Sequence, residues 1–159
     1  MEILIAPFGS PLYHQSITLR TSILRKPLNL TYTPFQLEEE KDQIHIVAEE
    51  NGEVLGVVLL QKIDANTAKL RQFAVKDKYQ NQGVGTELIA FFEDYAVEHG
   101  YTNIELHARE KAVRFFKQSQ YERVGEVFKE VTLNSLLLRI SSIIFFCRFC
   151  GFESSKCLF

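Results

Sequence analysis

The sequence has few cysteines, almost no excess charge and no long apolar run, and each of these shortages excludes a class of protein. All three cysteines lie near the C-terminus, at Cys147, Cys150 and Cys157. Cys147 and Cys150 have CxxC spacing, but a structural zinc site needs four ligands, and no second CxxC or nearby histidine completes one. We therefore expect reduced thiols in an apolar tail and no metal site.

The charge balance and the hydropathy pattern exclude two further classes. The formal net charge is −2, which lacks the basic excess of a nucleic-acid-binding protein. No apolar stretch reaches the roughly 20 residues of a membrane span. The first residues lack the basic segment of a signal peptide. These absences predict a cytoplasmic protein that binds neither nucleic acid nor a membrane.

The length of 159 residues suits one domain with its own core. We expect residues 1–140 to form that domain and residues 141–159 to form an atypical apolar tail that contains the cysteines. The tail favours self-association, so a homodimer stands beside a monomer as an alternative.

Strand and helix signals alternate along the chain, which predicts an α/β or α+β architecture. Asn51-Gly52 predicts a type I′ hairpin turn, so residues 44–75 should form an antiparallel meander. Helices are expected from Ser10 to Arg25, from the Gly83-Val84-Gly85 turn to His99, and from Arg109 to Gln118. Strands are expected at residues 2–6, 44–49, 54–62, 68–75, 102–108, 121–124 and 131–140, and residues 27–42 should be loop with one helical turn near 35–40.

The most informative stretch is the polar, glycine-rich turn between a strand and a helix at residues 76–86. Glycines at a helix start let the backbone approach a ligand closely. The free N–H groups of the first helical turn, with the helix dipole behind them, favour a phosphate. A P-loop lysine is missing, and Leu88 stands where a dinucleotide-binding fingerprint needs glycine. A glycine-rich turn without a ligand is the alternative.

Gln80-x-x-Gly83-x-Gly85 resembles the Q/R-x-x-G-x-G/A motif of the GNAT (GCN5-related N-acetyltransferase) superfamily. The strand end at residues 73–75, the strand at 104–108 and the helix through 112–116 follow in that family's order. The resemblance implies a mixed, mostly antiparallel sheet with helices on both faces and central strands splayed for coenzyme A. It also implies transfer of an acetyl group from acetyl-CoA to a primary amine of a small molecule or peptide.

The resemblance implies roles for individual residues. The backbone of Phe73, Ala74 and Val75 would pair with the pantetheine arm, and the Val75 N–H would polarise the thioester carbonyl. One of Phe115 and Phe116 would belong to the core, and the other would line the thioester pocket. Backbone N–H groups would hold the pyrophosphate at Gln80, Asn81, Gln82, Gly83, Val84, Gly85 and Thr86.

The chain departs from the family pattern at the positions of the general acid and the general base. Phe116 stands where many members have a tyrosine that protonates the departing thiolate, which leaves water or Tyr121 as the proton source. Lys69 lies near the position where some members carry a glutamate base, so Glu105 and His107 are the candidate bases. The missing tyrosine supports an alternative from another class, a catalytically silent acyl-CoA-binding module.

The sequence allows two interpretations for each of two charged features. Glu38-Glu39-Glu40 is either an acidic rim for an amine or a solvated run of charge. Arg109 is either a surface charge or a contact for a phosphate or an acidic substrate. Gln120 also replaces the family's usual glycine after the last helix.

Overall fold

The computed structural model describes residues 1–126, 128–130 and 133–141. The first half contains β1 (Glu2–Ile5), α1 (Pro11–Arg20), the π-helical turn η1 (Thr21–Arg25), the 3-10 turn η2 (Lys26–Leu28), α2 (Pro34–Glu38), β2 (Ile44–Glu50), β3 (Glu53–Lys62) and β4 (Thr67–Val75). The second half contains the 3-10 turn η3 (Asp77–Tyr79), α3 (Val84–Glu98), β5 (Asn103–Arg109), α4 (Glu110–Gln118), β6 (Glu122–Arg123), β7 (Phe128–Glu130) and β8 (Leu133–Ser141). Of the predicted apolar tail at 141–159, residues 142–159 lie outside these ranges.

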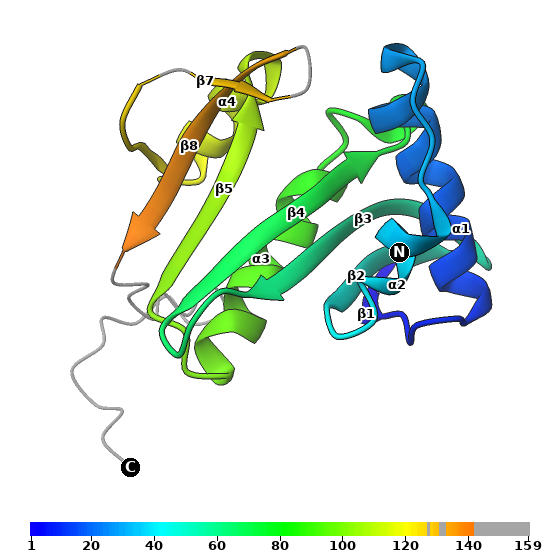
Figure 1. Cartoon of the computed structure of the whole chain (residues 1–159). Coiled ribbons are helices and arrows are strands. Elements are labelled where there is room, and N and C mark those ends of the chain that lie inside the picture. The colour runs from blue at the N-terminus through cyan, green and yellow to red at the C-terminus, as the bar shows by residue number, and fades with distance from the viewer. Residues whose placement is uncertain (127, 131–132, 142–159) are drawn as a thin grey trace.

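The strands form one mixed sheet in the order β1-β2-β3-β4-β5-β8-β6, with β7 paired to β8. Within the described residues β4 and β5 are the parallel pair, and the other pairs are antiparallel. Leu19 of α1 packs with Val57 and Ala74 on one face, while Leu88 and Phe92 of α3 belong to the core of the other face. Figure 1 shows α1 and α3 on opposite sides of the sheet. The predicted fold class is therefore confirmed.

The hairpin between β2 and β3 forms where the sequence predicts it. Asn51 has φ 52° and Gly52 has φ 81°, the pair of positive angles that a type I′ turn requires. The pairing of β2 with β3 and of β3 with β4 is antiparallel, as expected for residues 44–75. β7 is a three-residue strand that the sequence pattern did not indicate.

The first helix ends earlier than predicted. Ser10 caps it as expected, because its Oγ accepts the Tyr13 N–H at 3.2 Å. Regular α-helix stops at Arg20 and is followed by the π turn and the 3-10 turn. Pro27 has no N–H to donate and crowds the preceding turn. The hydroxyls of Thr21 and Ser22 bind carbonyls of the same segment at 2.8 Å, and such bonds compete with the helical ladder.

A β-bulge in β4 opens the centre of the sheet. β4 pairs with β3 in one register up to Arg71 opposite Leu59 and in another from Ala74 opposite Val57. The extra residue is accommodated at Gln72, whose φ is 53°. β4 pairs with β5 only from Thr67 to Leu70. A bulge bends its strand and increases its twist, so the two strands separate beyond this point, as Figure 1 shows.

Candidate active site

A cleft of about 540 Å³ lies where β4 and β5 separate. Its lining comes from η1, η2, β3, β4, β5, α4 and β8. Leu70 and Leu106 belong to the core on the α3 side. Lys69, Arg71 and His107 alternate with them along the strands and therefore project from the other face. The cleft thus opens on the sheet face that carries α1 and reaches the gap between the two central strands.

The backbone of β4 beyond the bulge offers an unpaired edge to this gap. The Lys76 N–H donates to the Leu55 carbonyl at 2.9 Å, so these two residues form a hydrogen-bonded antiparallel pair. Such pairs alternate along a ladder. Ala74 opposite Val57 is then the next hydrogen-bonded pair, while Val75 opposite Gly56 is a non-hydrogen-bonded pair. The N–H groups of Phe73 and Val75 consequently point away from β3, toward the gap.

Two glutamine side chains stabilise the backbone of the glycine-rich turn through hydrogen bonds. Gln80 Nε2 donates to the Val75 carbonyl at 3.0 Å and to Asp77 Oδ1 at 3.0 Å. Gln82 Nε2 donates to the Lys78 carbonyl at 2.6 Å. The Gln80 N–H donates to the Asp77 carbonyl at 3.2 Å. This N–H is therefore already used within the 3-10 turn, which narrows the predicted phosphate cradle to residues 81–86.

The start of α3 leaves N–H groups for a ligand. Gly83 precedes the helix with φ 90°, and the Glu87 N–H makes the first helical bond to the Gly83 carbonyl at 3.0 Å. The N–H groups of residues 84–86 therefore lie ahead of the helical ladder, at the positive end of the helix dipole. Oxygens of a pyrophosphate fit these donors.

An aromatic cluster joins this turn to the gap. The Phe73 and Phe115 rings stack with centroids 5.4 Å apart, and Phe116 meets both rings edge-on at 5.5 and 5.2 Å. A Cβ on Gly85 would lie 3.1 Å from Phe73 Cζ and 3.3 Å from Phe115 Cζ, so a larger residue at this position would have to displace these two rings by a few tenths of an ångström. Phe73 and Phe116 line the cleft, and Phe115, which does not line it, lies beside Phe73 against Gly85 of α3.

Tyr121 lies behind Phe116 and does not line the cleft. Its ring meets Phe116 edge-on at 5.7 Å, and its side chain is almost fully buried. Burial raises the pKa of Tyr121 well above its usual value, and the Glu93 carboxylate raises it further. The hydroxyl is therefore a poor source of a proton for a thiolate in the gap.

The two candidate bases have different surroundings. His107 lines the cleft, and its Nε2 lies 3.3 Å from Lys69 Nζ. If Lys69 is an ammonium, it donates to this nitrogen, which places the imidazole proton on Nδ1. Glu105 does not line the cleft, and its Oε2 accepts from Arg139 Nη2 at 3.1 Å. Of the two, His107 is the one that a substrate in the cleft can reach.

The sequence interpretation missed most of the cleft's positive charge. Arg25, Arg71 and Arg109 are half-buried and line the cleft beside Lys69 and His107. Arg109 Nη2 donates to the Leu24 carbonyl at 3.0 Å, so this residue is more than a surface charge. The alternation of Lys69 with Arg71 along β4 and of His107 with Arg109 along β5 was the available signal.

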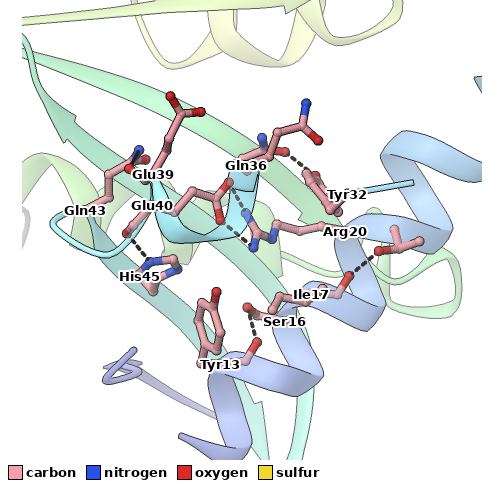
Figure 2. Close-up of polar contacts among 12 residues, drawn as sticks. Tyr13, Ser16, Ile17, Arg20, Tyr32, Gln36, Glu39, Glu40, Gln43 and His45 are labelled. Carbon is pink, nitrogen blue, oxygen red and sulfur yellow. Dashed lines mark hydrogen bonds and ion pairs between the residues drawn. The ribbon is translucent and has the colours of Figure 1, made fainter. Parts of the chain in front are cut away.

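A buried network supports the loop beside the cleft. Arg20 donates to both carboxylate oxygens of Glu40, at 3.0 and 2.9 Å, and both side chains are almost fully buried. The Arg20 and Arg25 guanidinium groups lie 5.1 and 4.4 Å from the Tyr32 ring centroid. The Tyr32 hydroxyl donates to Gln72 Oε1, in the bulge, at 2.5 Å. Figure 2 shows the Arg20–Glu40 pair between α1 and the loop.

This network corrects one interpretation of the glutamate run. Glu38 and Glu39 are exposed, and Glu38 pairs with Lys41 at 3.3 Å. Glu40 is neither part of an acidic rim nor solvated, because Arg20 neutralises it in the interior. The sequence pattern could not separate the third glutamate from its neighbours, since its partner lies 20 positions earlier.

His45 gives this network a pH dependence. Its ring is buried, and Nε2 donates to the Glu40 carbonyl at 2.9 Å when it carries the proton (Figure 2). Burial lowers the pKa of His45 from 6.5, and the Arg20 charge adds to this effect. Because the unfolded chain then binds more protons, the free energy of unfolding should fall as pH drops below about 6.5. Urea titrations at a series of pH values should show the free energy of unfolding falling by up to about 1.4 kcal/mol per pH unit below this point. His45→Gln should not show this fall. Equal pH dependence in the two proteins would contradict the role of His45.

Comparisons with known proteins identify the family and the fold. The acetyltransferase (GNAT) family matches residues 14–120, which is more than half of the chain, and the chain belongs to this family. A Xenopus tropicalis protein named "Probable N-acetyltransferase 14" is 29% identical over 114 residues, covering 69% of this chain and 54% of that protein. The chain thus spans about half the length of this curated relative.

Solved structures share the fold at low identity. An aminoglycoside 6′-N-acetyltransferase complexed with coenzyme A superposes with a TM-score of 0.76 at 16% identity, covering 91% of this chain and 98% of that one. A GNAT family acetyltransferase from Elizabethkingia anophelis with acetyl-CoA bound gives 0.64 at 17% identity, covering 88% and 97%. The named ligands of these neighbours are coenzyme A and acetyl-CoA.

Two searches of the described residues were negative. No helix among them is long and apolar enough to cross a membrane. Among the same residues, no group of three or more histidine, cysteine, aspartate or glutamate side chains is arranged to hold a metal ion. The three cysteines lie outside the described ranges.

Proposed function

We propose that this protein is an N-acetyltransferase that moves the acetyl group of acetyl-CoA to a primary amine of a small molecule or peptide. The observation that carries the proposal is the unpaired β4 edge at residues 73–75, which meets the start of α3 on one side and the cleft on the other. Membership of the GNAT family supports the same reaction. The coenzyme A complexes of two structural neighbours support the choice of donor.

In this proposal the backbone does most of the binding. The N–H groups of residues 81–86 hold the pyrophosphate, and the β4 edge at Phe73 and Val75 pairs with the pantetheine arm as an added strand. Ala74 spaces these two groups. The Phe115 and Phe116 rings, with Phe73, flank the thioester. The Val75 N–H donates to the thioester oxygen as negative charge develops there.

The reaction is direct attack of a neutral amine on the thioester carbonyl. The new C–N bond forms, the C–S bond breaks, and the amine proton leaves through His107 or water while the thiolate is protonated by water. His107 is the proposed base because it faces the cleft, and its Nε2 accepts the amine proton once the 3.3 Å contact with Lys69 Nζ is broken. Glu105 is the second candidate because Arg139 pairs with it. A thiolate with a thiol pKa near 8.5 departs readily, which lets the reaction proceed without the tyrosine that Phe116 replaces.

Acetyl-CoA titration of Gly83→Val, with Gly100→Val as its matched control, tests the cradle. Both glycines have positive φ, 90° and 82°, and both have open space around an added Cβ. Both variants should therefore lose similar stability, about 1–3 kcal/mol. Calorimetry should show binding at least tenfold weaker for Gly83→Val only, because its side chain enters the phosphate site at the start of α3 while Gly100 follows the other end.

The outcomes separate the proposed function from its alternatives. Equal affinity of the two variants and the wild-type protein would show that the cradle lies elsewhere. Tight binding by the wild-type protein without coenzyme A release on any amine would favour a catalytically silent acyl-CoA-binding module. No binding by the wild-type protein would end the transferase proposal.

A further inference from the structure

The lining of the cleft carries charge of one sign. Arg25, Lys69, Arg71 and Arg109 come from η1, β4 and β5, and among the side chains that the structure describes no carboxylate is part of the lining. In the part of the chain that the structure describes, none of these four cations lies within 4.0 Å of a carboxylate oxygen. The described lining of the cleft therefore combines four positive charges with no carboxylate counter-charge.

The polar contacts of these cations are to neutral groups. Arg71 Nη1 donates to Gln61 Oε1 at 3.3 Å, and Arg109 donates to a backbone carbonyl. The Arg25 guanidinium lies over the Tyr32 ring. All four side chains are half-buried, so water screens their mutual repulsion less than it would at the surface. A cleft lined by one sign of charge concentrates ligands of the other sign.

Neighbouring carboxylates are committed to other cations. Glu105 pairs with Arg139 at 3.1 Å, and Glu40 pairs with Arg20 at 2.9 Å. The phosphates of coenzyme A do not account for the cations either. The glycine-rich turn meets the α3 face of the sheet through Gly85 and Phe73, whereas Lys69 and Arg71 project from the opposite face. The unbalanced charge thus belongs to the acceptor side of the site.

We infer that the acceptor amine carries an anionic group, a carboxylate or a phosphate, which the guanidinium groups of the cleft bind. This inference rests on the proposed function and specifies its substrate class. Planar guanidinium groups match both kinds of oxyanion with paired hydrogen bonds. The inference differs from one of the two interpretations of Glu38-Glu39-Glu40, an acidic rim for an amine, and the third glutamate of that run is buried against Arg20.

The same positive charge favours the reactive form of the amine. An ammonium group placed among cations loses its proton more readily, since like charges disfavour the protonated form. The anionic group supplies the attraction that brings the substrate into the cleft, and the neutral amine then faces the thioester. Recognition and deprotonation would therefore depend on one set of side chains.

Matched amine pairs test the inference. Phenylalanine against phenethylamine isolates a carboxylate, O-phosphoethanolamine against ethanolamine isolates a phosphate, and cadaverine is the dication. The expected result is a kcat/KM at least tenfold higher for the anionic member of one pair, and the pair that responds identifies the anion. Equal or faster turnover of the amine without the anionic group in both pairs, or turnover of cadaverine equal to or faster than that of both anionic amines, would overturn the inference while leaving the transferase function intact.

Product binding separates the two possible failures. Calorimetry of the coenzyme A-loaded protein with N-acetylphenylalanine and N-acetylphenethylamine, and with the acetylated ethanolamine pair, measures recognition without turnover. Preference for an anionic product without any transfer would support the charged cleft and reject the transferase. Equal affinity within both pairs would reject the charged cleft.

Variants at one cation complete the test. Arg71→Gln should reduce the preference for the anionic substrate at least tenfold, while Arg71→Lys should retain part of it. Lys117→Gln removes an exposed charge from α4 and should leave the preference unchanged. Melting temperatures of all three variants near the wild-type value show that folding is not the cause. An unchanged preference in Arg71→Gln would overturn the role of Arg71.

Discussion

Replacing Val75 with proline should lower kcat/KM by about 10²–10³ while leaving the protein folded. The substitution removes the N–H that points into the gap, and loss of one oxyanion donor costs roughly this factor. Proline at this position would not remove a hydrogen bond between β3 and β4, because Val75 and Gly56 form a non-hydrogen-bonded pair. Steady-state rates with acetyl-CoA, together with a melting curve, measure the two effects separately.

Ala74→Pro is the control for this experiment. The Ala74 N–H points the other way, toward β3, and belongs to the ladder with Val57. Its loss should lower the melting temperature, since proline removes a ladder hydrogen bond from a central strand. A Val75→Pro protein with full activity would show that another group polarises the thioester carbonyl.

Arg20→Met should lower the free energy of unfolding by about 3–5 kcal/mol. The substitution leaves the Glu40 carboxylate in the interior without the two hydrogen bonds that Arg20 now donates. It also removes one of the two cations over the Tyr32 ring. Urea denaturation at pH 7 measures the loss.

The double variant Arg20→Met/Glu40→Met is the informative comparison. Removing both charges also removes the desolvation penalty, so the double variant should be more stable than Arg20→Met. Exposed Lys41→Met, which breaks a surface pair with Glu38, should change stability by less than about 1 kcal/mol. Equal stability of the single and double variants would show that the interior does not penalise an unpaired Glu40.

Much of the fold could be predicted from local signals. Asn51-Gly52 determined a hairpin, Ser10-Pro11 determined a helix start, and alternation placed Ile104 and Leu106 on the buried face of β5. These features depend on residues within a few positions of each other. The end of α1 was predicted less well, because hydroxyl groups and Pro27 share control of the backbone there.

The candidate site was predictable only where a motif lies in one stretch. The turn at residues 76–86 gave the start of α3 and the proposed cradle. The cations of the cleft come from positions 25, 69, 71 and 109, and only the sheet register brings β4 beside β5. Glu40 was misread for the same reason, since its partner on α1 is 20 positions away. Alternation along each strand indicates which side chains share a face, but it does not indicate which strands lie side by side.

The position of the site depends on the one extra residue that β4 has at Gln72 relative to β3. Removing one residue from β4 at the bulge would restore a continuous register with β3 and take away the cause of the divergence from β5. The number of residues in β4 therefore determines where the two strands separate, whichever side chains surround the opening. A chain that is 16% identical to this one shares its fold, so most side chains can differ while the order of strands and helices is kept.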